Sequence, residues 1–218
     1  MKQILFLATL AVGLNACNET NKISKTETLQ QKIGKAYGID NFSKLNKLSY
    51  TFNTKRGETV SSRSWVWHTK KNLIEFKSPT ANVVYQRDTI QSAELKRIDG
   101  MFINDQYWLM YPFHIIWDAG TTQSIKYNVM TPISKQNATM LTVQYGSVGG
   151  YTPGDAYDVY VNDQNMITEW SYRSKGVEKP SLTTTWSGVK DFSGVKLTTD
   201  FSNEAKTFNL FFTNVSAE

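Results

Sequence analysis

Histidine and acidic side chains are the residues of this chain that could carry acid–base chemistry, and they are scattered. The two histidines, His68 and His114, lie far apart in the sequence. Asp155 and Asp158 are close together and Glu169 falls in the next predicted strand, so these acids could hydrolyse a glycosidic bond if burial raised the pKa of one of them. The simpler interpretation is that Asp155 belongs to a turn and that Asp158 points outward from a strand.

The spacing of these residues matches no metal site and no local catalytic motif. A zinc site needs several His or Cys ligands at recognisable spacing, and this chain has two His and one Cys. The G-x-S-x-G turn that carries the nucleophile of many hydrolases is missing from the sequence. A Ser-His-Asp arrangement need not be local, so an enzyme stays open as the third hypothesis. We predict no metal and no cofactor.

Cys17 is the only cysteine, and its surroundings indicate covalent attachment to lipid. The chain begins with the basic segment Met1-Lys2-Gln3, and the apolar run Ile4–Leu14 follows, which is the layout of a secretory signal. The run is shorter than the roughly 20 residues that cross a bilayer. Leu14-Asn15-Ala16-Cys17 resembles the lipobox of bacterial lipoproteins, although Asn15 departs from the usual small or aliphatic residue. The resemblance implies that Cys17 carries a diacylglycerol and becomes the first residue after cleavage.

These features divide the chain into three segments. Residues 1–16 are predicted to be a lipoprotein signal peptide, residues 17–28 the lipidated cysteine and a polar tether, and residues 29–218 a single domain. Two or three acyl chains, at about 0.8 kcal/mol per buried methylene, make a stable anchor. Because no dense acidic run follows Cys17, we expect an outer-membrane anchor that faces the periplasm. The alternative is an ordinary signal peptide with an incidental cysteine.

Composition and charge disfavour disorder and nucleic-acid binding. Hydrophobic residues make up 40% of the chain and aromatic residues 13%, too much apolar content for a disordered protein. Residues 18–71 contain 11 Lys or Arg against 4 Asp or Glu, whereas residues 72–218 contain 12 against 15. The basic excess next to the anchor either faces anionic lipid headgroups or is a solvated face. No basic helix or RNP-like motif is present, so we expect no nucleic-acid partner.

The hydrophobic pattern predicts an N-terminal helical region followed by a long run of strands. Ser24-Lys25-Thr26-Glu27 has the spacing of a capping box, ahead of a helix that ends at Gly38, and a second short helix follows. From Leu48 onward apolar residues alternate in roughly ten or eleven segments, with turns at Asn162–Asn165 and Asp191–Gly194. The expected fold is mainly β with some helix (α+β), an antiparallel meander or open barrel.

One segment, Asn104–Gly120, interrupts this alternation. Its middle is apolar and contains Pro112, and Tyr107, Trp108, Tyr111 and Ile115 have helical spacing. The pattern predicts two helical turns with a break before Pro112. An apolar helical insert in a strand meander must bury itself, and the concave face of the sheet is the place for it.

Aromatic side chains give the strongest indication of a binding site. Tryptophan and tyrosine bury large areas while keeping a polar group, so those in the insert could line a cavity for an acyl chain or an isoprenoid. Core packing is the simpler interpretation for most of them, and stacking on sugar rings is a third. The candidate cavity residues are Trp108, Tyr111, Phe113, His114, Trp117 and Trp170.

Three stretches carry a resemblance to known proteins. NDQYWLMYPFHIIWD, LTVQYGSVGGYTPGDAYDVYVNDQNMITEWSYR and TTTWSGVKDFSGVKLTTDF resemble an uncharacterised family of bacterial lipoproteins, a domain of unknown function. More remotely, the chain is similar to LolA/LolB-like lipoprotein carriers. The shared features are the N-terminal helix, the meander, the helical segment midway and the Tyr157–Trp170 hairpin. That resemblance implies an open antiparallel β half-barrel of about ten to eleven strands, with short helices over its concave face and a cavity for acyl chains. Fold analogy does not establish function.

Three functional hypotheses follow. The leading one is a lipid-anchored cell-envelope binding or carrier protein that holds an apolar ligand, an acyl chain or a lipoprotein, in a concave aromatic cavity. The alternative is an envelope scaffold or sensor domain that binds another protein across the same surface, and a hydrolase comes third. The expected partners are the membrane, through the N-terminal lipid, and either an apolar ligand or an envelope protein. A hollow cavity would favour the carrier, and a filled one the scaffold.

Overall fold

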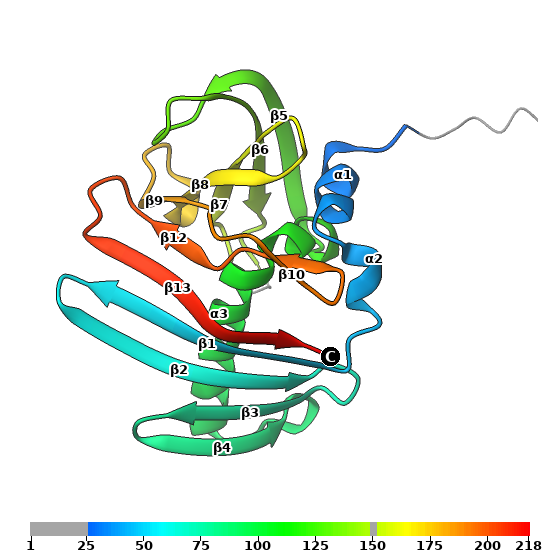
Figure 1. The fold of residues 1–218 in the computed structure, drawn as a ribbon, viewed down its shortest axis with the longest axis vertical. Helices are drawn as coiled ribbons and strands as arrows, with labels where there is room; N and C mark the ends of the chain where they lie inside the picture. The colour runs from blue at the N-terminus through cyan, green and yellow to red at the C-terminus, as the bar shows by residue number, and fades with distance from the viewer. Residues whose placement is uncertain (1–25, 149–151) are drawn as a thin grey trace, which may run out of the picture.

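The computed structural model describes residues 26–148 and 152–218 (Figure 1). The predicted signal peptide, Cys17 and most of the tether lie outside these residues. The helices are α1 (Leu29–Ala36), α2 (Ile39–Phe42) and α3 (Ala93–Trp117), with the short 3-10 turns η1 (Arg87–Thr89) and η2 (Ser174–Gly176). The strands are β1 (Lys47–Arg56), β2 (Thr59–His68), β3 (Leu73–Ser78), β4 (Ala81–Gln86), β5 (Thr121–Met130), β6 (Asn137–Tyr145), β7 (Ala156–Val161), β8 (Ile167–Arg173), β9 (Leu182–Thr185), β10 (Lys190–Phe192), β11 (Val195–Leu197), β12 (Asp200–Ser202) and β13 (Phe208–Ala217).

The strands form two antiparallel sheets and a small hairpin, so the prediction of a mainly β fold is confirmed. The larger sheet has six strands in the order β12-β13-β1-β2-β3-β4, and the smaller has five in the order β5-β6-β7-β8-β9. β10 and β11 pair only with each other in the described chain. The two sheets meet where Ser187 bridges Asp200 and where the Thr185 hydroxyl accepts a hydrogen bond from the Ser202 N–H at 3.2 Å.

The strand pattern of the sequence is largely reproduced, with a few differences. The described residues contain 13 strands, more than the ten or eleven predicted. Both predicted turns are present. Asn162 Oδ1 accepts the Gln164 and Met166 N–H groups, and Asp191 Oδ1 accepts the Gly194 N–H at 2.8 Å.

The predicted break in the Asn104–Gly120 insert is wrong. α3 is one 25-residue helix that begins at Ala93 and runs through Pro112, not a pair of short helices. Ser92 begins it, because its hydroxyl accepts the Leu95 N–H at 3.1 Å. Proline inside a helix costs about 3 kcal/mol because it removes one backbone donor. Here burial of the helix between two sheets outweighs that cost.

α3 lies along the inner faces of both sheets, and the core forms around it (Figure 1). Phe102 contacts the rings of Trp65 and Trp67, both on β2, at centroid distances of 5.5 and 5.7 Å. On the other side, Tyr111 contacts Tyr157 of β7 at 5.0 Å and Trp170 of β8 at 5.1 Å. The expectation that helix covers the inner face is therefore met by one long helix.

The N-terminal helices pack at the C-terminal end of α3. The capping box of α1 is Thr28 with Gln31, not the predicted Ser24 with Glu27, so the helix begins later than expected. Gly38 follows α1 with φ of 81°, and a Cβ at this position would lie 2.0 Å from the carbonyl oxygen of Gly194. Only glycine lets the β10–β11 hairpin approach so closely.

Of the helices in the described residues, none has the length and apolar character needed to cross a membrane.

Candidate binding cleft

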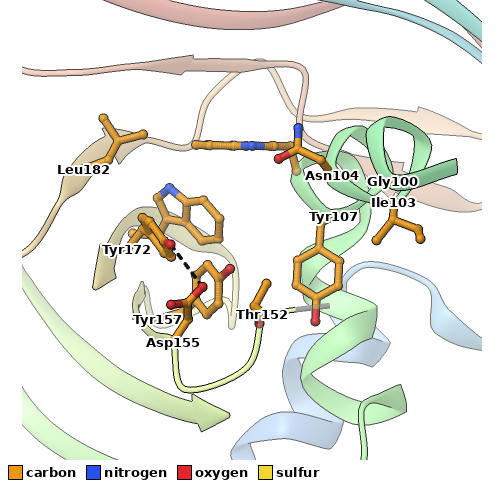
Figure 2. Close-up of a pocket in the computed structure, with 11 residues that line it drawn as sticks. Gly100, Ile103, Asn104, Tyr107, Thr152, Asp155, Tyr157, Tyr172 and Leu182 are labelled. Carbon is orange, nitrogen blue, oxygen red and sulfur yellow. Dashed lines mark hydrogen bonds between the residues drawn. The ribbon is translucent and has the colours of Figure 1, made fainter. Parts of the chain in front are cut away.

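A cleft of about 440 Å³ opens between α3 and strands β7 to β9. Figure 2 shows Asn104 and Tyr107 entering it from α3, and Tyr157, Tyr172 and Leu182 entering from the sheet. The α3 residues that line it have the spacing of a single helix face. They are Gly100, Ile103, Asn104, Tyr107 and Trp108. The rest of the lining is Thr152, Asp155, Tyr157, Trp170, Tyr172 and Leu182.

Stacked aromatic rings form one wall of the cleft. Trp170 and Tyr172, both on β8, contact Tyr157 of β7. The ring centroid of Trp170 lies 5.0 Å from that of Tyr157, and the ring centroid of Tyr172 lies 5.3 Å from it. Trp108 reaches across from α3 to contact Trp170 edge-on at 4.6 Å. The alternation of β7 and β8 points these sheet residues toward α3, because Tyr157 pairs with Tyr172 and Val159 with Trp170. The wall is therefore a cluster of aromatic rings in mutual contact.

Gly100 keeps the mouth of the cleft open. It lies inside α3, where glycine is about 1 kcal/mol less favourable than alanine. A Cβ at this position would meet nothing within 4 Å, so packing does not demand glycine. A larger side chain there would instead project into the cleft, which Gly100 lines.

A few polar groups lie among the aromatic residues. Asp155 accepts a hydrogen bond from the Tyr172 hydroxyl at 3.0 Å, drawn dashed in Figure 2, and another from the Lys175 N–H at 2.8 Å. The indole Nε1 of Trp170 is buried and donates to no partner in the described chain. An apolar cavity with few, fixed polar groups is the usual form of a small-molecule site.

The predicted cavity residues divide into two groups. Trp108 and Trp170 line the cleft, and Tyr111 is fully buried directly behind Trp170. Trp117, predicted to line the cavity, instead lies against Phe42 at 4.9 Å and is 40% exposed. The reason is the uninterrupted helix: nine residues at about 100° per residue place Trp117 on the side opposite Trp108.

Phe113 and His114 also lie outside the cleft. Phe113 is fully buried against Phe42 and Trp117. His114 belongs to a buried polar network near the end of α3, where its Nδ1 lies 2.8 Å from Asp118 Oδ1 and its Nε2 lies 2.9 Å from Gln106 Nε2. Because the Gln106 amide nitrogen can only donate, Nε2 accepts and Nδ1–H donates to Asp118.

Asp118 is the acceptor at the centre of this network. The hydroxyls of Tyr107 and Tyr145 both donate to its Oδ2, the latter at 2.8 Å, and the two hydroxyls lie 2.8 Å apart. Burial favours the neutral acid, but the hydrogen bond and charge interaction with His114, together with the hydrogen bonds from Tyr107 and Tyr145, outweigh it and lower the pKa of Asp118 below its ordinary value. Tyr107 also lines the cleft, so this network fixes part of the cleft wall.

The other acids considered for catalysis each hold a structural partner. Asp158 forms a two-point ion pair with Arg173, with Nε to Oδ2 at 2.8 Å and Nη2 to Oδ1 at 3.1 Å. Glu169 is buried and accepts the N–H groups of Ile133 and Ser134, both at 2.7 Å, which fixes the turn between β5 and β6.

His68 lies on the outer face of β2, away from the tryptophans of that strand, and contacts Glu75 at 2.6 Å. Across residues 26–148 and 152–218, no three His, Cys, Asp or Glu side chains are grouped so that they could hold a metal ion.

Sequence reasoning missed several lining residues, of which Tyr157, Leu182 and Asn104 matter most. Tyr172 could have been found by extending the alternation that places Trp170 inward, because residues two apart on a strand share a face. Tyr157 then follows from the pairing of β7 with β8, in which it lies opposite Tyr172. Asn104 could have been found from a helix face that includes Trp108 four residues on. Leu182 carries no local signal, since its place depends on the pairing of β8 with β9.

The chain is thus a mainly β domain with an aromatic-lined cleft, and comparisons add little to that description. It matches no protein-family model and no curated protein. Among solved structures it is similar to a DUF1329 family protein from Desulfovibrio piger, with 10% sequence identity and a TM-score of 0.48 over 88% of this chain and 94% of that chain. The resemblances to a lipoprotein family and to lipoprotein carriers stay predictions.

Proposed function

We propose that this protein is a cell-envelope binding or carrier protein that holds an apolar ligand, such as an acyl chain, in the cleft between α3 and strands β7 to β9. The observation that carries the proposal is the hollow itself. A volume of about 440 Å³ with an aromatic wall lies within the roughly 300–1,000 Å³ of typical small-molecule sites. A scaffold that binds protein partners over its surface has no need of this space.

The arrangement of the sheets supports the same interpretation. Joined at Ser187 and Asp200, the two sheets are interpreted as one curved half-barrel, with α3 on its concave side. The cleft lies between α3 and strands β7 to β9 on that side. This layout agrees with the one that the remote resemblance to LolA/LolB-like carriers implies.

Anchoring is the second part of the proposal. In it Cys17 is lipidated, residues 17–28 form the tether, and the domain faces the periplasm from the outer membrane. The described chain begins with exposed residues directly before α1, as a tether that leaves the domain at one end requires.

The proposal is binding without catalysis. Asp158 and Glu169 are occupied by Arg173 and by backbone N–H groups, and Asp155 by Tyr172 and Lys175. A pair of acids that converges on the cleft would have favoured the hydrolase hypothesis instead. Among the described lining residues Asp155 is the single acid of this cleft.

The test is a calorimetric titration of the full chain carrying Cys17→Ser with decanol, a neutral single-chain probe. We expect saturable binding with one site. Gly100→Leu and Leu182→Trp each fill the cleft and should weaken binding at least about tenfold. Val84→Trp, which adds the same indole to an exposed position on β4, should bind like the parent chain.

Melting curves for all variants show whether they remain folded. Gly100→Leu should not lower stability, because leucine is a better helix former than glycine. If decanol does not bind the parent chain, or if Gly100→Leu binds it equally well while folded, the cleft is not the site. If an envelope protein binds saturably to the parent chain and equally well to Gly100→Leu and Leu182→Trp, the scaffold hypothesis would be favoured.

A further inference from the structure

A second cavity of about 690 Å³ adjoins the first and is lined by residues of β1, β2 and β13 of the larger sheet. The two share Asn104, Trp108, Tyr172 and Leu182, so they are neighbours, and together they are called the groove below. The second cavity has a different lining. It has the apolar residues Phe52, Phe208 and Leu210, the hydroxyls of Thr54, Ser181 and Thr207, and the two cations Arg56 and Arg63. No carboxylate is among the described residues that line it.

Along the paired strands β1 and β13, the side chains that face this cavity change from apolar to charged. On the inner face Phe52 pairs with Phe212, then Thr54 with Leu210, and finally Arg56 with Phe208. Phe52 and Phe212 are buried, Thr54 is half-buried and Arg56 is exposed. Polarity therefore rises step by step toward the end of the hairpin, which is the order that an amphiphile with one polar end would match.

The two arginines are not equivalent. Arg63 donates to Asp105 through Nε at 2.6 Å and through Nη2 at 2.5 Å, so its charge is neutralised by a buried carboxylate. Arg56 lies over the ring of Phe208 at 5.5 Å and forms no ion pair with an acid of the described chain. Arg56 is thus the uncompensated cation of the groove, and its guanidinium is positioned by stacking on an aromatic ring.

Building on the proposed function, we infer that the ligand is an anionic amphiphile. A single hydrocarbon chain extends from the cleft past Trp108 to Phe52 and Leu210 in the second cavity, and a carboxylate or phosphate at its end pairs with Arg56. Planar guanidinium groups bind both anions through paired N–H donors. The Thr54 hydroxyl lies two residues away on the same face and can supply a further donor.

The experiment compares three probes of equal chain length on the full chain carrying Cys17→Ser: decanol, decanoate and decyl phosphate. Titrations at neutral pH and low salt should show one or both anions binding about three- to tenfold more tightly than decanol. Arg56→Gln should abolish this preference and leave the affinity for decanol unchanged. Arg56→Lys should retain part of the preference for anions, because lysine keeps the positive charge but lacks the paired N–H donors of the planar guanidinium.

Lys55→Gln is the matched control. Lys55 is the preceding residue of the same strand, it is exposed, and it points to the opposite face, so its replacement removes one positive charge outside the groove. It should leave the preference for anions intact. Which of decanoate and decyl phosphate binds more tightly distinguishes a fatty-acid ligand from a phosphate-bearing one.

Three outcomes would overturn the inference, and the last can be told apart from the first two. Equal affinity for all three probes, or equal effects of Arg56→Gln and Lys55→Gln, would reject the role of Arg56 and leave the apolar cleft standing. A parent chain that binds none of the probes would reject the proposed function and this inference with it.

Discussion

Arg63 of β2 and Asp105 of α3 form a two-point ion pair inside the protein, and the Trp65 indole donates to the same carboxylate at 2.7 Å. Asp105 is fully buried, and burial raises the pKa of its carboxyl even though Arg63, Asn104 and Trp65 donate hydrogen bonds to it. Such a pair fixes the position of the helix against the sheet more than it adds net stability.

Removing one partner of this pair should therefore be costly. Asp105→Ala leaves the Arg63 guanidinium and the Trp65 N–H without their acceptor, and we expect a loss of about 3–5 kcal/mol in the free energy of unfolding. The double replacement Arg63→Met with Asp105→Leu should be clearly more stable than Asp105→Ala alone. Chemical denaturation measures both. A single variant within about 1 kcal/mol of the parent chain would contradict the account.

Asp118 should make stability depend on pH at the acid end. Its pKa in the folded protein is lowered, so the unfolded chain takes up the proton first, and the contribution of Asp118 is lost as the pH falls below about 4. Asp118→Asn should cost about 1–3 kcal/mol at neutral pH, since three donors lose a charged acceptor. The difference in the free energy of unfolding between the variant and the parent chain should become smaller as the pH falls below about 4. Urea unfolding at several pH values measures it. A difference that does not change with pH would speak against an ionised Asp118.

Replacing Gly38 with alanine should cost far more stability than the same change at Gly120, another glycine with positive φ. Gly38→Ala adds a Cβ that clashes with the Gly194 carbonyl, in addition to the left-handed backbone cost of about 1–2 kcal/mol. Gly120→Ala is the matched control, because Gly120 has φ of 72° and open space around its Cα. Thermal melts should show a clearly larger loss for Gly38→Ala. Similar losses for the two would mean that the hairpin does not pack against the α1–α2 corner as described.

Cys17 should determine where the protein is found. Expressed in a bacterial host, the parent chain should sediment with membranes, and Cys17→Ser should lose that lipid attachment and the cleavage that follows it. Mass spectrometry of the membrane fraction should show a diacylglyceryl group on the parent chain. An unmodified mature N-terminus that begins at a different residue would support an ordinary signal peptide instead.

The position of a residue could be predicted from the sequence where nearby residues in the chain determine it. It could not be predicted where contacts with residues distant in the sequence determine it. Most strands were predicted because alternation is a local property, and the turns at Asn162 and Asp191 because their side chains bond backbone groups nearby. The break at Pro112 was predicted wrongly, because the penalty of a proline is local whereas the packing that outweighs it comes from both sheets.

The cleft shows the same division. Trp108 and Trp170 were found as candidates because large aromatic residues in an apolar segment indicate burial. The expectation for Trp117 depended on a break before Pro112, and in the continuous helix its side chain lies on the side opposite Trp108. Gly100 and Leu182 could not be recognised as lining residues, because only the pairing of β8 with β9 and the position of α3 bring them together.

The most direct test of the central claim, that the groove holds an apolar chain, is photolabelling. The full chain carrying Cys17→Ser is irradiated with a long-chain alcohol that carries an aliphatic diazirine, and the labelled residues are identified by mass spectrometry. We expect labels on α3 between residues 100 and 108 and on Trp170, Tyr172 and Leu182, suppressed by excess decanol and by Gly100→Leu. Labels confined to the exposed Trp117 surface, or unaffected by competitor, would contradict the account.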